Sequence, residues 1–131
     1  MDLCDHLGLS GANGSAGTLF FSNGTRESKA AFAGTTMIPT RTWNHVALVR
    51  DSTSVRVYLN GNPTPELAGE AQGIALHDAE QVFIGGRFDG VDNFEGKIDE
   101  VAIYKRALSP QEVAEHFKVS GMISPTANGA K

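Results

Sequence analysis

The chain has 131 residues, a formal net charge of -4 and one cysteine, so we expect one domain without an internal disulfide. Its 11 lysine and arginine residues form no basic run, which argues against nucleic acid or an anionic membrane as partner. The apolar runs are too short for a membrane-spanning helix, and residues 1–6 lack the pattern of a signal peptide. The 15 glycines favour tight turns and an all-β chain.

The first third of the chain predicts a hairpin followed by a weaker strand. Loose apolar alternation in Leu3–Ser10 and the apolar run Leu19–Phe21 flank a segment rich in glycine and asparagine, residues 11–17. Lys29–Thr36 contains small residues around one phenylalanine, and Pro39 behind it cannot donate to a ladder. We expect a poor strand or an edge strand there.

The middle of the chain predicts two paired antiparallel strands. Trp43–Arg50 and Val55–Leu59 alternate apolar and polar residues on either side of the polar turn 51–53. Asn60-Gly61 ends the second strand, because asparagine and glycine adopt left-handed backbone angles most easily. Two further short strands are expected at 74–76 and 82–84, the second ending at Gly85-Gly86.

Phe94–Lys105 predicts one long strand. Ile98, Ala102 and Tyr104 would share one face with Glu100, and Val101 and Ile103 would lie on the other. Apolar residues on both faces are typical of a central strand.

A short helix should follow Ser109, which is a suitable N-cap with proline next and a reciprocal acid at Glu112. Val113 and Phe117 lie four residues apart and so share a helix face, and we expect the helix to end near Gly121. The sequence therefore predicts a domain over residues 1–120 and a flexible tail over 121–131.

Five motifs in this order resemble the C-terminal part of a laminin G-like domain of the concanavalin A-like lectin/glucanase superfamily. They are Trp43-Asn44-His45-Val46-Ala47, Val55–Gly61, Phe83–Gly86, Phe94–Tyr104 and Ala107-Leu108-Ser109. The resemblance implies an antiparallel β-sandwich of the jelly-roll type, here with one short C-terminal helix. It also implies a non-catalytic module for binding or adhesion, with carbohydrate or a surface protein as partner, in an extracellular or cell-surface setting.

Such domains carry several strands before the segment that matches Trp43, so we expect an incomplete sandwich that lacks or shortens its N-terminal strands. An open sheet would expose apolar side chains, and a homodimer formed by sheet pairing or strand exchange would cover them. The alternatives are a fragment that closes into a smaller sandwich and a structural module that associates with itself and binds no glycan.

The superfamily also contains glucanases, which place a carboxylate cluster along one strand. Asp99 and Glu100 are adjacent, so on a strand they would point to opposite faces and could not act on one sugar. His45 lacks a serine or cysteine nucleophile in a recognisable motif and is expected to be a hydrogen-bonded strand residue. We therefore expect no enzyme activity.

Calcium is the cofactor that the resemblance suggests, with Asp99 at the position of a structural calcium ligand. One carboxylate is far from the six to eight ligands that calcium takes, and a hydrogen-bonding role for Asp99 is the simpler interpretation. The loop residues Arg87, Asp89, Asp92 and Asn93 are candidates for ligand binding, with a solvated acidic turn as the alternative.

Aromatic residues offer a second kind of candidate. Trp43 could stack on a sugar ring, but its apolar neighbours Val46 and Leu48 favour packing in the core. Tyr58 and Tyr104 alternate with apolar residues and are expected to be half-buried, with each hydroxyl at a sheet edge.

Overall fold

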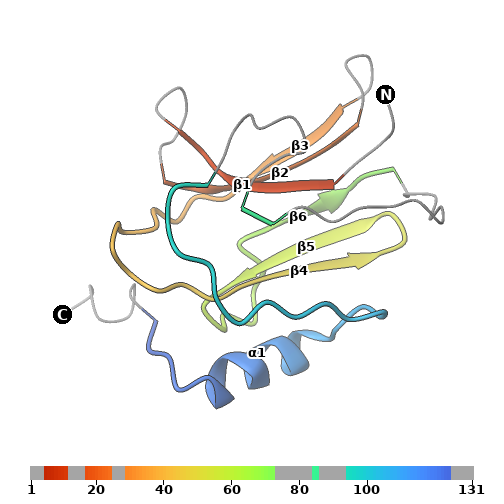
Figure 1. Ribbon diagram of the computed structural model, residues 1–131. Helices are drawn as coiled ribbons and strands as arrows, with labels where there is room; N and C mark the ends of the chain where they lie inside the picture. Colours follow the sequence, from red (N-terminus) through yellow and green to blue (C-terminus); the bar gives the residue numbers. More distant parts are fainter. Residues whose placement is uncertain (1–4, 12–16, 25–28, 73–83, 86–93, 125–131) are drawn as a thin grey trace. The chain divides into compact units, whose positions relative to one another are not determined.

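The computed structural model describes residues 5–11, 17–24, 29–72, 84–85 and 94–124 (Figure 1). The chain forms two compact units, one of residues 1–74 and 106–131 and the other of residues 75–105. All the strands and the helix of the described residues belong to the first unit.

Sheet A contains β1 (Asp5–Leu9), β2 (Leu19–Gly24) and β3 (Lys29–Ala33), in the order β1-β2-β3. Both pairs are antiparallel, so the predicted N-terminal hairpin is confirmed, and β3 lies at an edge as expected. Leu7 of β1 and Phe32 of β3 both align with Phe21 of β2, which puts all three side chains on one face.

Sheet B contains β4 (Val46–Asp51), β5 (Ser54–Leu59) and β6 (Leu67–Glu70), in the order β4-β5-β6. The antiparallel pair β4 and β5 confirms the prediction for this part of the chain. β4 begins three residues later than expected, because the residues from Trp43 to His45 belong to the preceding connection. β6 was not predicted.

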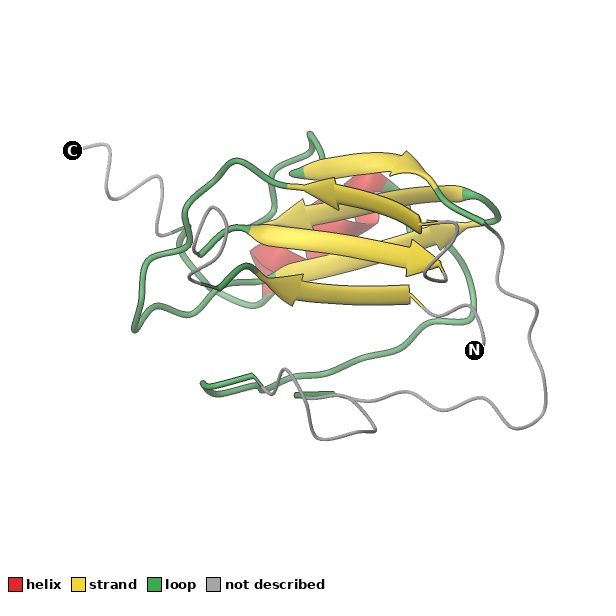
Figure 2. Cartoon of the chain, turned by 90° about the horizontal axis from the view of Figure 1, so that it is seen from above, coloured by secondary structure: helices red, strands yellow, loops and turns green. Residues whose placement is uncertain are grey.

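The two sheets pack face to face around the main hydrophobic core; Figure 1 shows the two layers, and Figure 2, seen from above, shows the strands of one overlying those of the other. The buried residues of this core are Leu19, Phe21, Val55, Val57, Leu59, Leu67 and Ala71. Phe21 stacks on Phe32 with the ring centroids 6.1 Å apart. Each large side chain fully buried here contributes about 1.5 to 3 kcal/mol, so this layer dominates the stability of the sandwich.

The outer face of sheet B is covered by α1 (Pro110–Val119). Val113 of the helix packs with Val49, Tyr58 and Leu108 in a second core. Tyr58 is therefore fully buried, so the expectation that it is half-buried with an edge hydroxyl is wrong.

The predicted cap of α1 is confirmed as a complete capping box. The Ser109 side chain accepts from the Glu112 N–H, and the Glu112 side chain accepts from the Ser109 N–H. Arg106 hydrogen-bonds the Glu112 carboxylate and, together with the Ser109 N–H, lowers the pKa of Glu112 to about 2.

The Asn60-Gly61 turn follows β5 as predicted, with φ of 51° at Asn60 and 73° at Gly61. A side chain at Gly61 would collide with the Phe117 ring of α1, so the glycine also permits close contact with the helix. This turn fixes both the end of β5 and the position of the last helical turn.

The prediction of a central strand over Phe94–Lys105 is wrong. These residues form no strand, and Ile98, Val101 and Ile103 are 48%, 54% and 70% exposed. Glu100 has a left-handed φ of 55°, which interrupts the two-residue alternation on which the prediction depended.

The two short strands expected before this segment have different outcomes. Residues 74–76, 82 and 83 lie outside the described residues. Ile84 lies in a bend and is 55% exposed, so it is not part of a buried strand.

Candidate functional site

The loop candidates Arg87, Asp89, Asp92 and Asn93 lie outside the described residues, so their role in ligand binding stays a prediction. The calcium candidate Asp99 is exposed, and its Oδ1 accepts the backbone N–H of Glu100 at 2.8 Å. Asp99 therefore accepts a backbone hydrogen bond, which is the alternative to a calcium-ligand role, and the calcium role itself stays a prediction. Over the described segments, no three acidic, histidine or cysteine side chains are grouped so that they could hold a metal ion.

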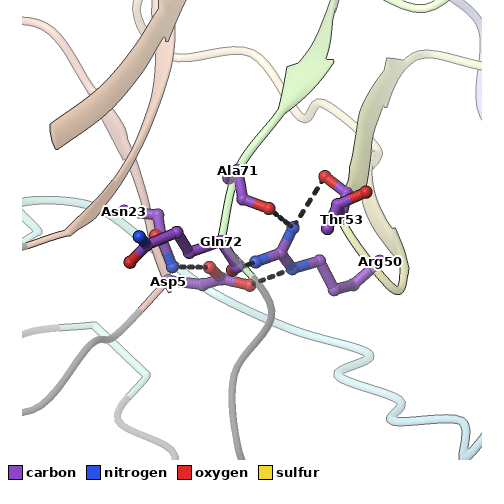
Figure 3. Close-up of polar contacts among 6 residues, drawn as sticks. All are labelled: Asp5, Asn23, Arg50, Thr53, Ala71 and Gln72. Carbon is purple, nitrogen blue, oxygen red and sulfur yellow. Dashed lines mark hydrogen bonds and ion pairs between the residues drawn. The ribbon is translucent and has the colours of Figure 1, made fainter. Parts of the chain in front are cut away.

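Arg50 is the centre of a polar cluster that sequence reasoning missed (Figure 3). Its Nη1 donates to the carbonyls of Thr53 at 3.1 Å and Ala71 at 3.3 Å, and its Nη2 donates to the carbonyl of Gln72. Its Nε forms an ion pair with Asp5 at 3.1 Å, without the alignment of a hydrogen bond. The guanidinium therefore connects β4 with the end of β6 and with sheet A.

Asp5 is held on its other side by Asn23, whose Nδ2 donates to Asp5 Oδ1 at 2.7 Å. Asp5 and Asn23 are aligned across β1 and β2, and Asn23 is buried. Both oxygens of Asp5 and all three nitrogens of Arg50 thus face partners within the chain. The cluster clamps the two sheets together and does not present a free charge to a ligand.

The connection between β3 and β4, residues 34–45, is irregular but firmly anchored at its start. The Glu66 carboxylate accepts the backbone N–H groups of Thr35 at 2.8 Å and Thr36 at 2.6 Å, and the Thr36 hydroxyl at 2.8 Å. Gly34 allows this approach, because a Cβ there would lie 2.6 Å from Glu66 Oε1. A backbone bond from Ile38 N–H to the carbonyl of Gly17 holds the next residues.

Asn60 anchors the other end of the connection. Its Oδ1 accepts the N–H of His45 at 2.8 Å, and its Nδ2 donates to Asn44 Oδ1 at 2.9 Å. Asn44 in turn donates to the carbonyl of Thr42 at 3.1 Å and to its hydroxyl at 3.0 Å, and that hydroxyl donates to the carbonyl of Pro39 at 2.7 Å. Side-chain hydrogen bonds therefore fix the conformation of residues 39–45, which form no sheet ladder.

Trp43 lies within this anchored segment and is 54% exposed, so the expectation that it packs in the core is wrong. The sequence signal was misleading because Trp43 precedes β4 and its side chain does not follow the alternation of the strand. Two residues earlier, Arg41 has a left-handed φ of 59°, which is uncommon for a residue with a long side chain.

His45 is partly buried between the Asn60 turn and α1, where its ring contacts Phe117 edge to face at a centroid distance of 5.9 Å. Burial, and secondarily the charge of His116, lower the pKa of His45 below 6.5. The expectation of a hydrogen-bonded strand histidine is wrong, because His45 lies just before β4 and its buried Nδ1 has no hydrogen-bond partner among the described residues.

A family model described as the concanavalin A-like lectin/glucanases superfamily, of the laminin G type, matches residues 6–114. The adhesion G-protein coupled receptor V1 of Danio rerio is 31% identical over 77 residues, which are 56% of this chain and 1% of the receptor. An S-layer domain-containing protein from Clostridium thermocellum ATCC 27405 has a solved structure with a TM-score of 0.48. It is 17% identical, over 88% of this chain and 63% of that one.

The described residues contain no helix with the length and apolar character needed to cross a membrane.

Proposed function

Because this chain belongs to the concanavalin A-like lectin/glucanases superfamily, we propose that it is a non-catalytic adhesion module that binds carbohydrate or a surface protein. The family match over residues 6–114 is the observation that carries this proposal. The two packed antiparallel sheets agree with the fold of that superfamily. Fold alone allows many functions, so the choice of a binding role also draws on the chemistry of the side chains.

A binding role is favoured over hydrolysis by the placement of the carboxylates. Hydrolysis of a glycosidic bond requires two carboxyl groups that flank the bond at a fixed separation. Asp99 contacts the N–H of its neighbour, while Asp5 and Glu66 are held by Arg50 and by the Thr35–Thr36 backbone. Each of these three carboxylates has a partner within the chain, and each comes from a different part of the sequence.

We place the module outside the cell or on its surface. The support is that one relative, of which this chain matches 1%, is an adhesion receptor. Calcium at Asp99 or at the loop with Asp89 and Asp92 is a further part of the proposal. Calcium titration in a calorimeter tests it, and the absence of both heat and any melting shift would remove it.

A glycan array probed with the purified domain, together with binding to immobilised extracellular-matrix proteins, tests the main proposal. We expect saturable binding to at least one glycan class or matrix protein. If the folded domain binds no glycan on the array and none of the immobilised matrix proteins, the proposal is contradicted.

A structural module that associates with itself is the second candidate. Leu9 of β1 and Val46 and Leu48 of β4 share their sheet faces with core residues, yet they are 37%, 37% and 38% exposed. Apolar side chains of this kind favour association between copies. Analytical ultracentrifugation at micromolar concentration distinguishes the candidates, because a stable monomer would rule out the homodimer.

A further inference from the structure

Trp43 is an unusual surface residue, because it is 54% exposed and stands between the polar residues Thr42 and Asn44. Tryptophan is highly buried on average, and a large exposed aromatic surface is a common feature of binding sites. It is also the only tryptophan of the chain, so no other indole could serve the same purpose.

The segment that carries Trp43 is ordered by hydrogen bonds before any ligand arrives. Thr42 binds back to Pro39, Asn44 binds Thr42, and Asn60 binds both Asn44 and His45. These bonds hold the backbone on either side of Trp43, so this segment loses little conformational freedom when a ligand covers the indole, which raises affinity.

Backbone strain in the same segment supports a functional role. Arg41 adopts a left-handed φ of 59°, as Ser52, Asn60 and Glu100 do with similar angles, and backbone strain of this kind is found at ligand-binding positions. The side chains of Thr40 and Arg41 are both exposed, so hydroxyl and guanidinium donors lie next to the indole in the sequence. An apolar ring beside polar donors suits a sugar, which has an apolar C–H face and a rim of hydroxyl groups.

We infer that residues 39–44, here called the Trp43 platform, form the glycan-binding surface of this domain, with the indole stacking on a pyranose ring. The inference rests on the proposed function and adds the residues and the class of ligand. It assigns the site to the β3–β4 connection, independently of the loop residues Arg87–Asn93.

The test uses the intrinsic fluorescence of Trp43, which reports on this site alone because the chain has one tryptophan. The domain is titrated with cellotetraose, mannotetraose, galactotetraose and chitotetraose. We expect at least one of them to shift the emission to the blue with saturation, because a stacked sugar excludes water from the indole.

Calorimetry with the same oligosaccharide then compares three variants. Trp43→Ala should weaken binding about tenfold or more, and Trp43→Phe should weaken it less because a smaller aromatic face remains. Val119→Ala is the matched control, since Val119 is an apolar residue exposed at 74% on α1. It should bind like the unaltered domain, and all variants should keep their circular dichroism spectrum.

The outcomes separate the inference from the proposed function. Saturable binding that leaves Trp43 emission unchanged, or that Trp43→Ala does not weaken, would overturn the inference and leave the binding module intact. No binding of any sugar in this panel or on the glycan array would remove the glycan part of the proposed function, and the inference with it.

Discussion

Arg50 of β4 and Asp5 of β1 form an ion pair at 3.1 Å that joins the two sheets of the sandwich. Their side chains are only 19% and 14% exposed. Arg50 also binds three backbone carbonyls around the ends of β4 and β6. One side chain thus fixes how the edges of the two sheets meet.

Arg50→Ala should lower the free energy of unfolding by about 2 to 3 kcal/mol, because it leaves the Asp5 carboxylate without its opposite charge and three carbonyls without their donor. Asp5→Asn keeps an oxygen that can accept from Asn23 and should cost less, about 1 kcal/mol. Urea denaturation followed by circular dichroism measures both. An Arg50→Ala variant as stable as the unaltered domain would show that the clamp is unimportant.

Glu66→Ala should destabilise the domain by about 2 kcal/mol, because the carboxylate accepts three hydrogen bonds from Thr35 and Thr36. Glu66→Gln should be milder, since an amide oxygen can still accept the two backbone N–H groups that bind Oε1. Thermal melting of the two variants is the measurement. Equal losses would mean that the charge of Glu66, rather than its geometry, anchors the connection.

Gly61→Ala should be far more damaging than Gly121→Ala, although φ is close to the same at both positions, 73° and 72°. A methyl group at Gly61 meets Phe117, whereas nothing lies within 4 Å of one at Gly121. We expect losses of about 3 kcal/mol and about 1 kcal/mol. Chemical denaturation measures the loss in unfolding free energy of each variant, and the difference between the two losses reports the contact of residue 61 with Phe117. Similar losses for the two variants would contradict the prediction.

Acid should destabilise the contact between α1 and the Asn60 turn. The pKa of His45 is lowered in the folded chain, so the unfolded chain binds the proton more readily as the pH falls below about 6.5. The His45 contribution to stability is therefore complete above that pH and is lost as the pH falls toward the folded pKa. Melting temperatures between about pH 7.5 and about pH 5.5 should fall less for His45→Asn than for the unaltered domain. Parallel curves for the two proteins would contradict this role.

The parts of the fold that the sequence predicted are those set by local chemistry. Ser109 and Glu112 define the start of α1 through contacts three residues apart, and the Asn60-Gly61 turn depends on the backbone preferences of two residues. The alternation in Val55–Leu59 was sufficient for β5, because its partner β4 is adjacent in the sequence.

The errors arose where distant residues decide the conformation. Tryptophan is a residue type common in strands, but a hydrogen bond between Asn60 and Asn44 holds the segment of Trp43 in an irregular connection. Phe94–Lys105 alternates like a strand, yet Glu100 turns to the left-handed region. The ion pair between Arg50 and Asp5 joins residues that lie far apart in the sequence, and no local sequence pattern predicts such a pair.

The assignment of the ligand site to the Trp43 platform is tested most directly by nuclear magnetic resonance of the ¹⁵N-labelled domain with the oligosaccharide that binds best. The single tryptophan gives one indole N–H signal, which can be followed during a titration. We predict that this signal and the amides of residues 40–44 shift most, with saturation at the calorimetric affinity. Shifts confined to other residues, with the indole signal unmoved, would contradict the assignment.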